Sequence, residues 1–308
     1  MPKGDKFIDL TRYLENCNQA EIVLCIEDIA KIVGGFSPYL YNRREPWNDS
    51  HGGSFCHSWL NAGYSAQLNA EFTAVTFTKI LDDCSTLTAN SAVAELSIEK
   101  AVAAIQKYHH TTKDGKHTRF RSWEHCYRGF QQNRSHADKT DFLCLHLACY
   151  LASWGMLRNS FLLDYDYLVH KPLVNELTTE KFTPLFNTRQ TMETVPLTLE
   201  ASKVIAKAYP GNHPTETLIS KILLGVFGAA PAYDKYFKDA ARKYKVCSGI
   251  WGEKSLVELW RYYKQHQDVF EKLRHDISPE GFLYTPMKLM DMCLWQIGDD
   301  ERPKNTRK

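Results

Sequence analysis

The sequence predicts a mainly α protein in which a helical C-terminal domain follows a small α+β, winged-helix-like N-terminal domain. Two observations predict this class. The 308 residues, 44% of them hydrophobic and 24% charged, have the length and composition of about two globular domains. Apolar residues recur at helical spacing over most of the chain and alternate, as in a strand, only within the first 80 residues. We therefore expect an accessory module over residues 1–85 and a helical domain over residues 92–300.

The N-terminal elements follow from three stretches of sequence. Residues 7–17 carry apolar side chains at helical spacing and predict a first helix. Residues 20–35 begin with a short alternating stretch and continue as a helix that ends at Gly34-Gly35, a common helix stop. Residues 57–80 predict a short helix followed by a hairpin. Helices followed by a hairpin in this order are typical of a winged helix.

A resemblance supports the N-terminal module. Its Gly, Trp and apolar residues are spaced as in a small, uncharacterised bacterial module that often accompanies other domains. The residues that carry the pattern are Ile29, Ile32, Gly34, Trp47, Asn48, Trp59, Leu60, Ala62 and Gly63. The resemblance implies that this segment is a separate domain, and it implies no particular function.

The domain boundary is expected in residues 82–95, which are small and polar. The charge changes across this segment. Residues 1–88 contain seven Lys and Arg against eleven Asp and Glu, whereas the rest of the chain contains 31 against 25. The positive net charge of the C-terminal domain is compatible with a nucleic-acid partner but does not require one.

Composition excludes several classes of protein. The chain has no apolar run of roughly 18 residues, so we expect no membrane span, and its charged N-terminus does not resemble a secretory signal. Nine cysteines without a CxxC pair are expected to be reduced thiols of a cytoplasmic protein. Twelve histidines include no HExxH or HxH pair, so we expect no metal site and no cofactor.

Beyond the boundary the chain predicts helices. Residues 141–157 are apolar around most of the helix circumference, so we expect a central buried helix there. Residues 214–228 begin with Pro and Thr and stop at Gly228. Residues 285–298 predict the last helix, whose methionines fit a core. The other helices are expected at residues 96–110, 199–211 and 255–276.

Residues 113–134 combine six Lys and Arg with interleaved aromatic residues. Cations neutralise phosphates and aromatic faces stack on bases, so this mixture suits an unpaired or flipped nucleotide. The candidates are Trp123 and Tyr127 for a base, Arg119, Arg121 and Arg128 for phosphates, and Glu124 as a carboxylate. The alternative is a solvated basic loop that leads into a helix whose aromatic side chains join the core.

Residues 218–244 form a second candidate site. A predicted helix runs into Gly225 and Gly228, whose backbone N–H groups would be accessible to a phosphate, and Lys221 would add a charge. Asp234 follows beside Tyr233, a candidate for stacking on a base. The alternative is an ordinary corner between two helices.

Residues 152–170 form a third candidate site. Gly155 interrupts an apolar helix directly after Trp154, and such a break often lines a pocket. Trp154 is therefore a further candidate for stacking on a base. Asn159 offers an amide that can hydrogen-bond a base edge. The alternative is an exposed loop with helix-capping residues.

The Leu224-Gly225-Val226 string, Gly228 and Asp234 loosely resemble helix-hairpin-helix DNA glycosylases, although no proline precedes Gly225 and Phe227 is inserted. From about residue 95 onward the chain also resembles anti-phage DNA glycosylases of the Brig type, which remove modified bases from phage DNA. The resemblance implies a base-flipping hydrolase that leaves an abasic site, with Asp234 as the catalytic carboxylate and Glu124 as second choice. DNA would be the partner.

Two other classes remain open. A metal-dependent nuclease would cut phosphodiesters and lose activity with a chelator. A non-catalytic nucleic-acid-binding or regulatory protein would bind without chemistry, and its binding would not depend on Asp234 beyond a charge effect.

Overall fold

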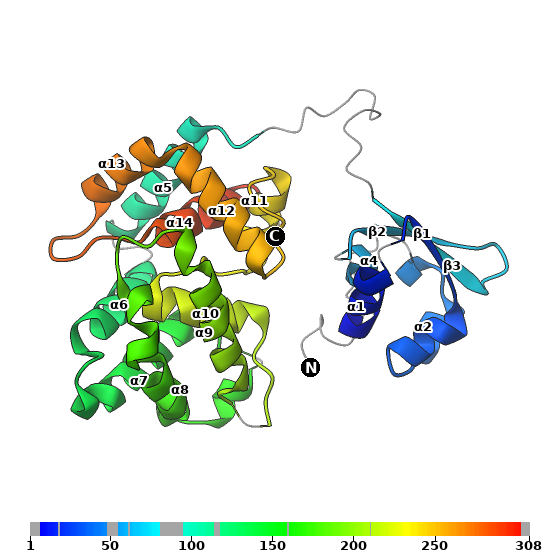
Figure 1. Cartoon of the computed structure of the whole chain (residues 1–308), viewed down its shortest axis with the longest axis horizontal. Coiled ribbons are helices and arrows are strands. Elements are labelled where there is room, and N and C mark those ends of the chain that lie inside the picture. Colours follow the sequence, from blue (N-terminus) through cyan, green and yellow to red (C-terminus); the bar gives the residue numbers. More distant parts are fainter. Residues whose placement is uncertain are drawn as a thin grey trace, which may run out of the picture. The chain divides into compact units, whose positions relative to one another are not determined.

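The computed structural model describes residues 7–17, 19–47, 55–60, 62–80, 95–113, 118–158, 160–209 and 211–302. The chain divides into two compact units, Met1–Asn90 and Ser91–Lys308, each with its own hydrophobic core (Figure 1). The segment in which we expected the boundary lies outside the described residues, except for Glu95. The predicted class, mainly α with a small α+β N-terminal region, is confirmed.

The N-terminal unit is built on a three-stranded antiparallel sheet. Its elements are α1 (Ile8–Cys17), β1 (Glu21–Cys25), α2 (Ile26–Ile32), α3 (Pro38–Asn42), η2 (Glu45–Trp47), α4 (His57–Leu60), β2 (Tyr64–Leu68) and β3 (Ala74–Lys79). β3 is the central strand, and the order is β1-β3-β2. The buried Phe77 pairs with Ile22 on one side and with Ala66 on the other. The predicted hairpin is thus β2–β3, and the alternating stretch before the second helix is β1.

Aromatic side chains fill the core of this unit. The rings of Trp47 and Phe55 meet edge to face at 4.8 Å, and those of Phe55 and Trp59 do so at 5.2 Å. Trp47 Nε1 donates to the Leu40 carbonyl oxygen at 2.9 Å, so its polar atom is satisfied inside the core. Trp47 and Trp59, which contribute to the resemblance noted above, are therefore core residues of this unit.

The second unit is helical. Its α-helices are α5 (Ile98–Lys113), α6 (Ser122–Asn133), α7 (Thr140–Ser153), α8 (Lys171–Leu177), α9 (Val195–Lys207), α10 (Glu216–Phe227), α11 (Lys235–Lys243), α12 (Glu253–Gln265), α13 (Gln267–Ile277) and α14 (Pro286–Asp300). Short 3-10 helices lie between them: η3 (Thr118–Arg121), η4 (Ala137–Lys139), η5 (Phe161–Asp164), η6 (Tyr167–His170), η7 (Glu180–Phe186) and η8 (Met192–Thr194). None of the helices described is long and apolar enough to cross a membrane.

Two central helices organise this unit. α10 is buried from Leu218 to Phe227, and α14 is buried from Pro286 to Gly298. α10 packs on α6, α7 and α9, whereas α14 packs on α5, α11, α12 and α13. Figure 1 shows these two groups of helices as the lower and upper parts of the unit. The chain passes from the group around α14 to the group around α10 between α5 and α6, and it returns through the loop between α10 and α11.

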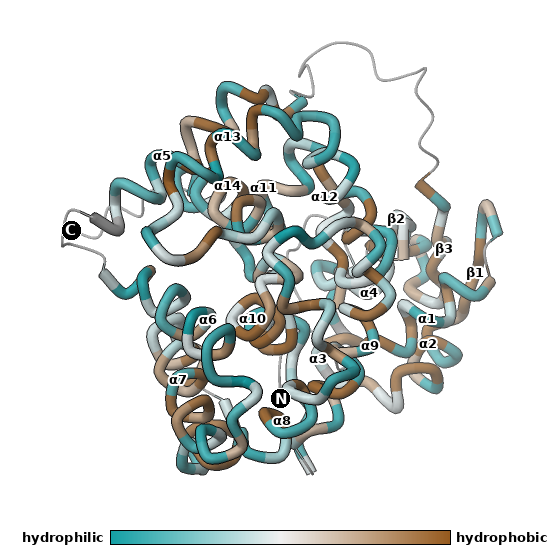
Figure 2. Tube along the Cα trace, turned by 60° about the vertical axis from the view of Figure 1, so that its left-hand side comes forward, coloured by the Kyte–Doolittle hydropathy of each residue, from teal (hydrophilic) through white to brown (hydrophobic). Residues whose placement is uncertain are grey.

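The prediction that residues 141–157 form a central buried helix is wrong. α7 ends at Ser153, and it lies at the surface with Phe142, Leu145 and Cys149 exposed. Figure 2 shows the hydrophobic character of α7. The fully buried helices are α10 and α14, because these are the ones that receive neighbours on all sides.

Capping residues fix the ends of the two central helices. Thr215 Oγ1 accepts from Leu218 N at the start of α10, and Thr285 Oγ1 accepts from Lys288 N at the start of α14. α10 ends at Gly228, whose φ of +63° belongs to the left-handed region that favours glycine. A side chain at Gly228 would also collide with Thr285, whose Oγ1 lies 2.5 Å from the Cβ position.

Candidate functional site

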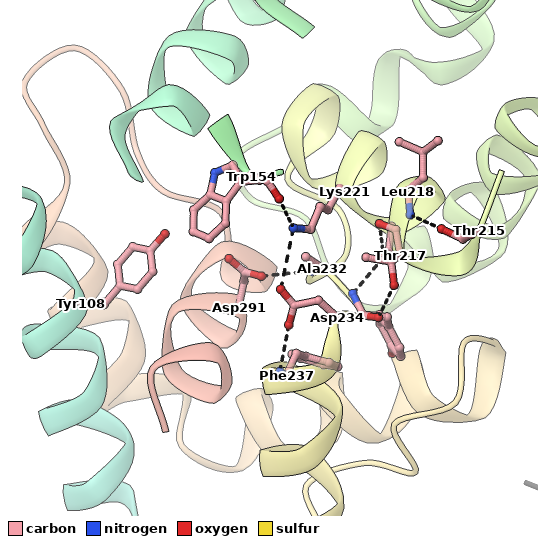
Figure 3. A network of polar contacts seen from close by, with 12 residues as sticks. Tyr108, Trp154, Thr215, Thr217, Leu218, Lys221, Ala232, Asp234, Phe237 and Asp291 are labelled. Carbon is pink, nitrogen blue, oxygen red and sulfur yellow. Dashed lines mark hydrogen bonds and ion pairs between the residues drawn. The ribbon is translucent and has the colours of Figure 1, made fainter. Parts of the chain in front are cut away.

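A buried cluster of charged residues lies where the two groups of helices meet. Lys221 comes from α10, Asp234 from the start of α11, and Asp291 from α14 (Figure 3). Lys288 joins them from α14. They line a small, largely buried cavity. The other lining residues are Tyr150, Trp154, Leu224, Ala232 and Trp295. The cluster holds two positive and two negative groups, so its charge is balanced within the fold.

Asp234 occupies the position that caps α11. Its backbone is extended, and its Oδ1 accepts a hydrogen bond from Phe237 N at 3.1 Å. Aspartate is a preferred N-cap residue because its carboxylate satisfies a free N–H group of the first turn, and the helix dipole favours negative charge there. Capping thus holds the carboxylate in place while its other oxygen, Oδ2, faces Lys221.

Lys221 approaches this carboxylate from the interior of α10. Its Nζ lies 3.8 Å from Asp234 Oδ2 and donates to the Trp154 carbonyl oxygen at 3.3 Å. The Lys221 side chain is 5% exposed and that of Asp234 is 16% exposed. Nζ also lies 5.2 Å from the centroid of the Trp154 ring, a cation–π distance. These contacts replace part of the hydration that the ammonium loses on burial.

Lys288 and Asp291 form a second buried ion pair one turn apart on α14. Their Nζ and Oδ2 atoms are 2.8 Å apart, and the two side chains are 3% and 5% exposed. Asp291 Oδ1 accepts from Ala232 N at 3.0 Å, and Lys288 Nζ donates to Tyr108 Oη at 3.3 Å. Both charges are therefore paired and hydrogen-bonded, as burial requires.

A stack of three aromatic rings lies beside the charged cluster. The rings of Tyr108 and Phe120 are 4.8 Å apart, and those of Phe120 and Trp154 are 5.2 Å apart, with interplanar angles of 11° and 10°. Trp295 meets all three rings edge to face. The Arg119 guanidinium lies 5.7 Å from the Trp154 ring centroid. Tyr108 and Phe120 are buried in the core, so of the three rings only the half-buried Trp154 could offer a face to a nucleobase.

Burial shifts the pKa values of both groups in the Lys221–Asp234 pair. Burial raises the pKa of Asp234, an effect that the Lys221 charge and the Phe237 N–H oppose. Burial lowers the pKa of Lys221, and the charges of Asp234 and Asp291 oppose that shift. Both pKa values therefore move toward neutrality. Titratable groups whose pKa values are shifted by burial and by a charged neighbour are common at catalytic sites.

The cavity is too small for a nucleobase in this structure. Its volume is about 10 Å³, roughly the space of one water molecule. The half-buried Trp154 lines it and contacts Lys221. Within the described part of the chain, Trp154 Nε1 is buried without a hydrogen-bond partner. A nucleobase can therefore reach Asp234 only if lining side chains such as Trp154 move.

Three of the predicted site residues come together here: Asp234, Lys221 and Trp154. Lys221, however, was predicted to contact the DNA backbone. The structure corrects its place, because its ammonium lies inside the fold, against Asp234 and Trp154. Arg119 lies at the edge of the aromatic stack and is exposed, as a phosphate contact requires.

The prediction of an accessible glycine hairpin is wrong. Gly225 lies inside α10, and a Cβ there would come within 2.6 Å of the Tyr150 ring, so this glycine allows close packing. Gly228 N donates to the Leu224 carbonyl oxygen at 2.9 Å, and Gly228 O accepts from Thr285 Oγ1 at 2.7 Å. Neither glycine offers a free N–H group to a phosphate.

Three aromatic residues predicted for the base pocket lie in the core instead. Trp123 and Tyr127 stack on each other at 4.8 Å, and Trp123 Nε1 donates to Leu224 O at 2.7 Å. Tyr233 directs its hydroxyl to Ser255 Oγ at 2.8 Å, and it does not line the cavity around its neighbour Asp234. Helical spacing shows which side chains share one face of a helix. It does not show whether that face packs in the core or lines a pocket.

The remaining predicted residues lie outside the cavity. Glu124 accepts a hydrogen bond from the Tyr284 hydroxyl and lies 3.7 Å from Arg121 Nε. The Arg128 guanidinium lies 4.8 Å from the Phe282 ring centroid. Asn159 is outside the described residues. The described residues contain no group of three or more His, Cys, Asp or Glu placed to hold a metal ion.

Sequence reasoning missed Lys288, Asp291, Tyr108 and Phe120. A signal for the first two was present: they are charged residues three positions apart in the apolar run of residues 285–298. Charges inside an apolar helix are costly unless they are paired, so this spacing indicates a buried pair. Nothing in the local sequence marks Tyr108, because it joins the stack through tertiary packing.

Comparison of the chain with known protein families, curated proteins and solved structures found no match.

Proposed function

We propose that the helical unit is a DNA glycosylase that excises a flipped, modified base by hydrolysing the N-glycosidic bond. One observation carries this proposal: a buried Lys221–Asp234 pair lies beside a stack of three aromatic rings. A carboxylate that faces a small, largely buried cavity would provide the charge that this reaction needs. Trp154, the half-buried ring of the stack, would provide the surface on which a flipped base stacks.

The chemistry assigned to Asp234 follows from the charge that develops in the reaction. As the bond between the base and C1′ breaks, positive charge builds on the sugar, as in glycoside hydrolysis. The Asp234 carboxylate would stabilise that charge and accept a proton from the attacking water. Water attacks C1′, and the bond electrons leave with the base. The Lys221 charge opposes the rise that burial causes in the pKa of Asp234 and so favours the carboxylate form.

The aromatic stack supplies base binding. Flipping a base out of the duplex costs a few kcal/mol, and stacking on an aromatic side chain returns about 1–3 kcal/mol per base. Trp154 is the ring of the stack that lines the cavity beside Asp234. Its displacement would open the cavity and offer its face to the base.

Backbone phosphates would be bound at the edge of this site. Arg119 is exposed, and its guanidinium lies 5.5 Å from the Phe120 ring centroid and 5.7 Å from that of Trp154. Arg121 is also exposed and lies two residues further along η3. Both charges could therefore contact the phosphates that flank a flipped nucleotide.

The test is incubation of the purified full chain, in EDTA, with duplex and single-stranded DNA carrying unmodified cytosine, hydroxymethylcytosine or glucosylated hydroxymethylcytosine. Alkali then reveals abasic sites, and mass spectrometry identifies the released base. The proposal expects base release in the presence of EDTA from at least one modified substrate.

Either of two other outcomes would overturn the glycosylase proposal and favour another class of protein. Strand cleavage that requires added Mg²⁺ and releases no base would identify a metal-dependent nuclease. Binding to DNA without base release or cleavage of any of these substrates would favour the non-catalytic class.

A further inference from the structure

The loop that carries Asp234 into the cavity has little means of fixing its own conformation. Residues 228–233 are Gly-Ala-Ala-Pro-Ala-Tyr, and all of them are buried. The first five have no side-chain hydrogen-bonding group. The loop's position must therefore be set by side chains of the helices around it.

Both central helices hold this loop immediately before Asp234. From α14, Asp291 Oδ1 accepts from Ala232 N at 3.0 Å. From α10, Ser220 Oγ accepts from Tyr233 N at 2.9 Å, and Thr217 Oγ1 donates to Tyr233 O at 3.0 Å. Three successive peptide groups, from Pro231 to Asp234, are thus anchored by buried or partly buried side chains.

The contact from α14 is directly linked to Asp234 through the backbone. The Ala232 peptide donates its N–H to Asp291, and the Ala232 carbonyl oxygen accepts from Asp234 N at 2.8 Å. Asp291 itself is oriented by Lys288, whose Nζ is 2.8 Å from its other oxygen. A continuous series of contacts therefore runs from Lys288 through Asp291 and Ala232 to Asp234.

We propose that Asp291 is a positioning residue for Asp234: its hydrogen bond to the Ala232 N–H fixes the α10–α11 loop so that the Asp234 carboxylate faces the cavity. This inference rests on the proposed glycosylase function for its kinetic consequence. Asp291 contacts no reacting atom in this role. It acts through the backbone, and Lys288 acts through Asp291.

The test compares two double variants, K288M/D291N and K288M/D291L. Both lack the buried ion pair, so neither leaves an unpaired charge. Asparagine keeps an oxygen that can accept from Ala232 N, whereas leucine of similar size does not. The comparison therefore isolates the hydrogen bond. Asp300→Asn is the surface control, because Asp300 lies on the same helix and pairs with Lys107 at 2.7 Å.

We expect single-turnover base release by K288M/D291L to be about 100-fold slower than by K288M/D291N, because a misplaced catalytic group costs about that factor. The two variants should bind the DNA substrate with similar Kd, and D300N should match the wild-type protein. Equal rates for the two double variants would overturn the proposal. A loss confined to Kd would also overturn it.

A second measurement does not depend on activity. The Phe237 amide donates to the Asp234 carboxylate, so its NMR resonance reports where that carboxylate lies. We expect the Phe237 resonance to stay near its wild-type position in K288M/D291N and to move in K288M/D291L. If it is the same in both folded variants, Asp291 does not position Asp234. If the resonance moves but the wild-type protein releases no base, only the glycosylase function fails.

Discussion

Lys221 Nζ lies 3.8 Å from Asp234 Oδ2, and both groups are enclosed between the two central helices of the C-terminal unit. The two residues come from consecutive elements, α10 and α11. The charge of each residue opposes the pKa shift that burial causes in the other. Because the pKa of each group depends on the charge of the other, the pair is the central feature of the site.

Replacing Lys221 with methionine should move the acid limb of the pH–rate profile to higher pH. The Lys221 charge lowers the pKa of Asp234 against the effect of burial, so its loss raises that pKa further. A reaction that needs the carboxylate is then lost at a higher pH as the solution is acidified. The measurement is single-turnover base release as a function of pH.

Lys238→Met is the matched control for this substitution. Lys238 lies on α11 and pairs with Glu216 at 3.1 Å, outside the cavity. We expect its pH profile to coincide with that of the wild-type protein. An acid limb that stays in place in K221M would contradict the electrostatic role given to Lys221.

Gly225→Ala should lower stability by about 1–3 kcal/mol, the usual cost of overpacking a core. The new methyl group would lie 2.6 Å from the Tyr150 ring. Chemical denaturation would measure the change, with Gly129→Ala as control, because the nearest atom there is 3.4 Å away. Weaker DNA binding with unchanged stability would instead favour the phosphate-binding role predicted from the sequence.

His170 should make the helical unit less stable in acid. Burial lowers the pKa of His170 from 6.5 to about 4, and its Nδ1 lies 2.8 Å from Tyr209 Oη. The unfolded chain binds a proton below pH 6.5 while the folded chain does not, so stability is full above that pH and falls as pH decreases toward 4. The loss should reach about 3 kcal/mol. His170→Gln should reduce this pH dependence in urea titrations. An unchanged pH dependence would contradict the role given to His170.

Arg119→Ala should weaken DNA binding in a salt-dependent way. Removing one phosphate contact reduces the slope of log K against log salt by about 0.9 for duplex DNA. Fluorescence anisotropy at several salt concentrations measures this slope. Arg242→Ala is the control, because Arg242 donates to the carbonyl oxygens of Ser248 and Gly249. An unchanged slope in R119A would remove Arg119 from the DNA interface.

The sequence predicted the class of the fold because hydrophobic spacing and stop signals are local. Gly228 ends α10, and Asp234 begins the next helix, as the residue types indicate. The sequence could not show that α7 lies at the surface while α10 and α14 are central, because an apolar composition does not reveal how many neighbours a helix receives.

The candidate site was predictable only in part. Asp234 and Trp154 were selected as a carboxylate and an aromatic residue at helix ends, and both line the cavity. Lys288 and Asp291 join them from more than 50 residues away in sequence, through the packing of α14. Trp123 and Tyr127 have the same residue types as a base-binding pair, yet burial places them in the core.

The most direct test of the account is the rate of base release by Asp234→Asn. Asparagine is an equally good helix N-cap and can still accept from Phe237 N, so the fold of α11 should be retained. Asp239→Asn on the same helix is the control, because Asp239 is exposed and lies outside the cavity. We predict that D234N loses base release by about 10²–10⁴-fold on a substrate that the wild-type protein and D239N both process. Release by D234N at the wild-type rate would contradict the assignment of Asp234 as the catalytic carboxylate.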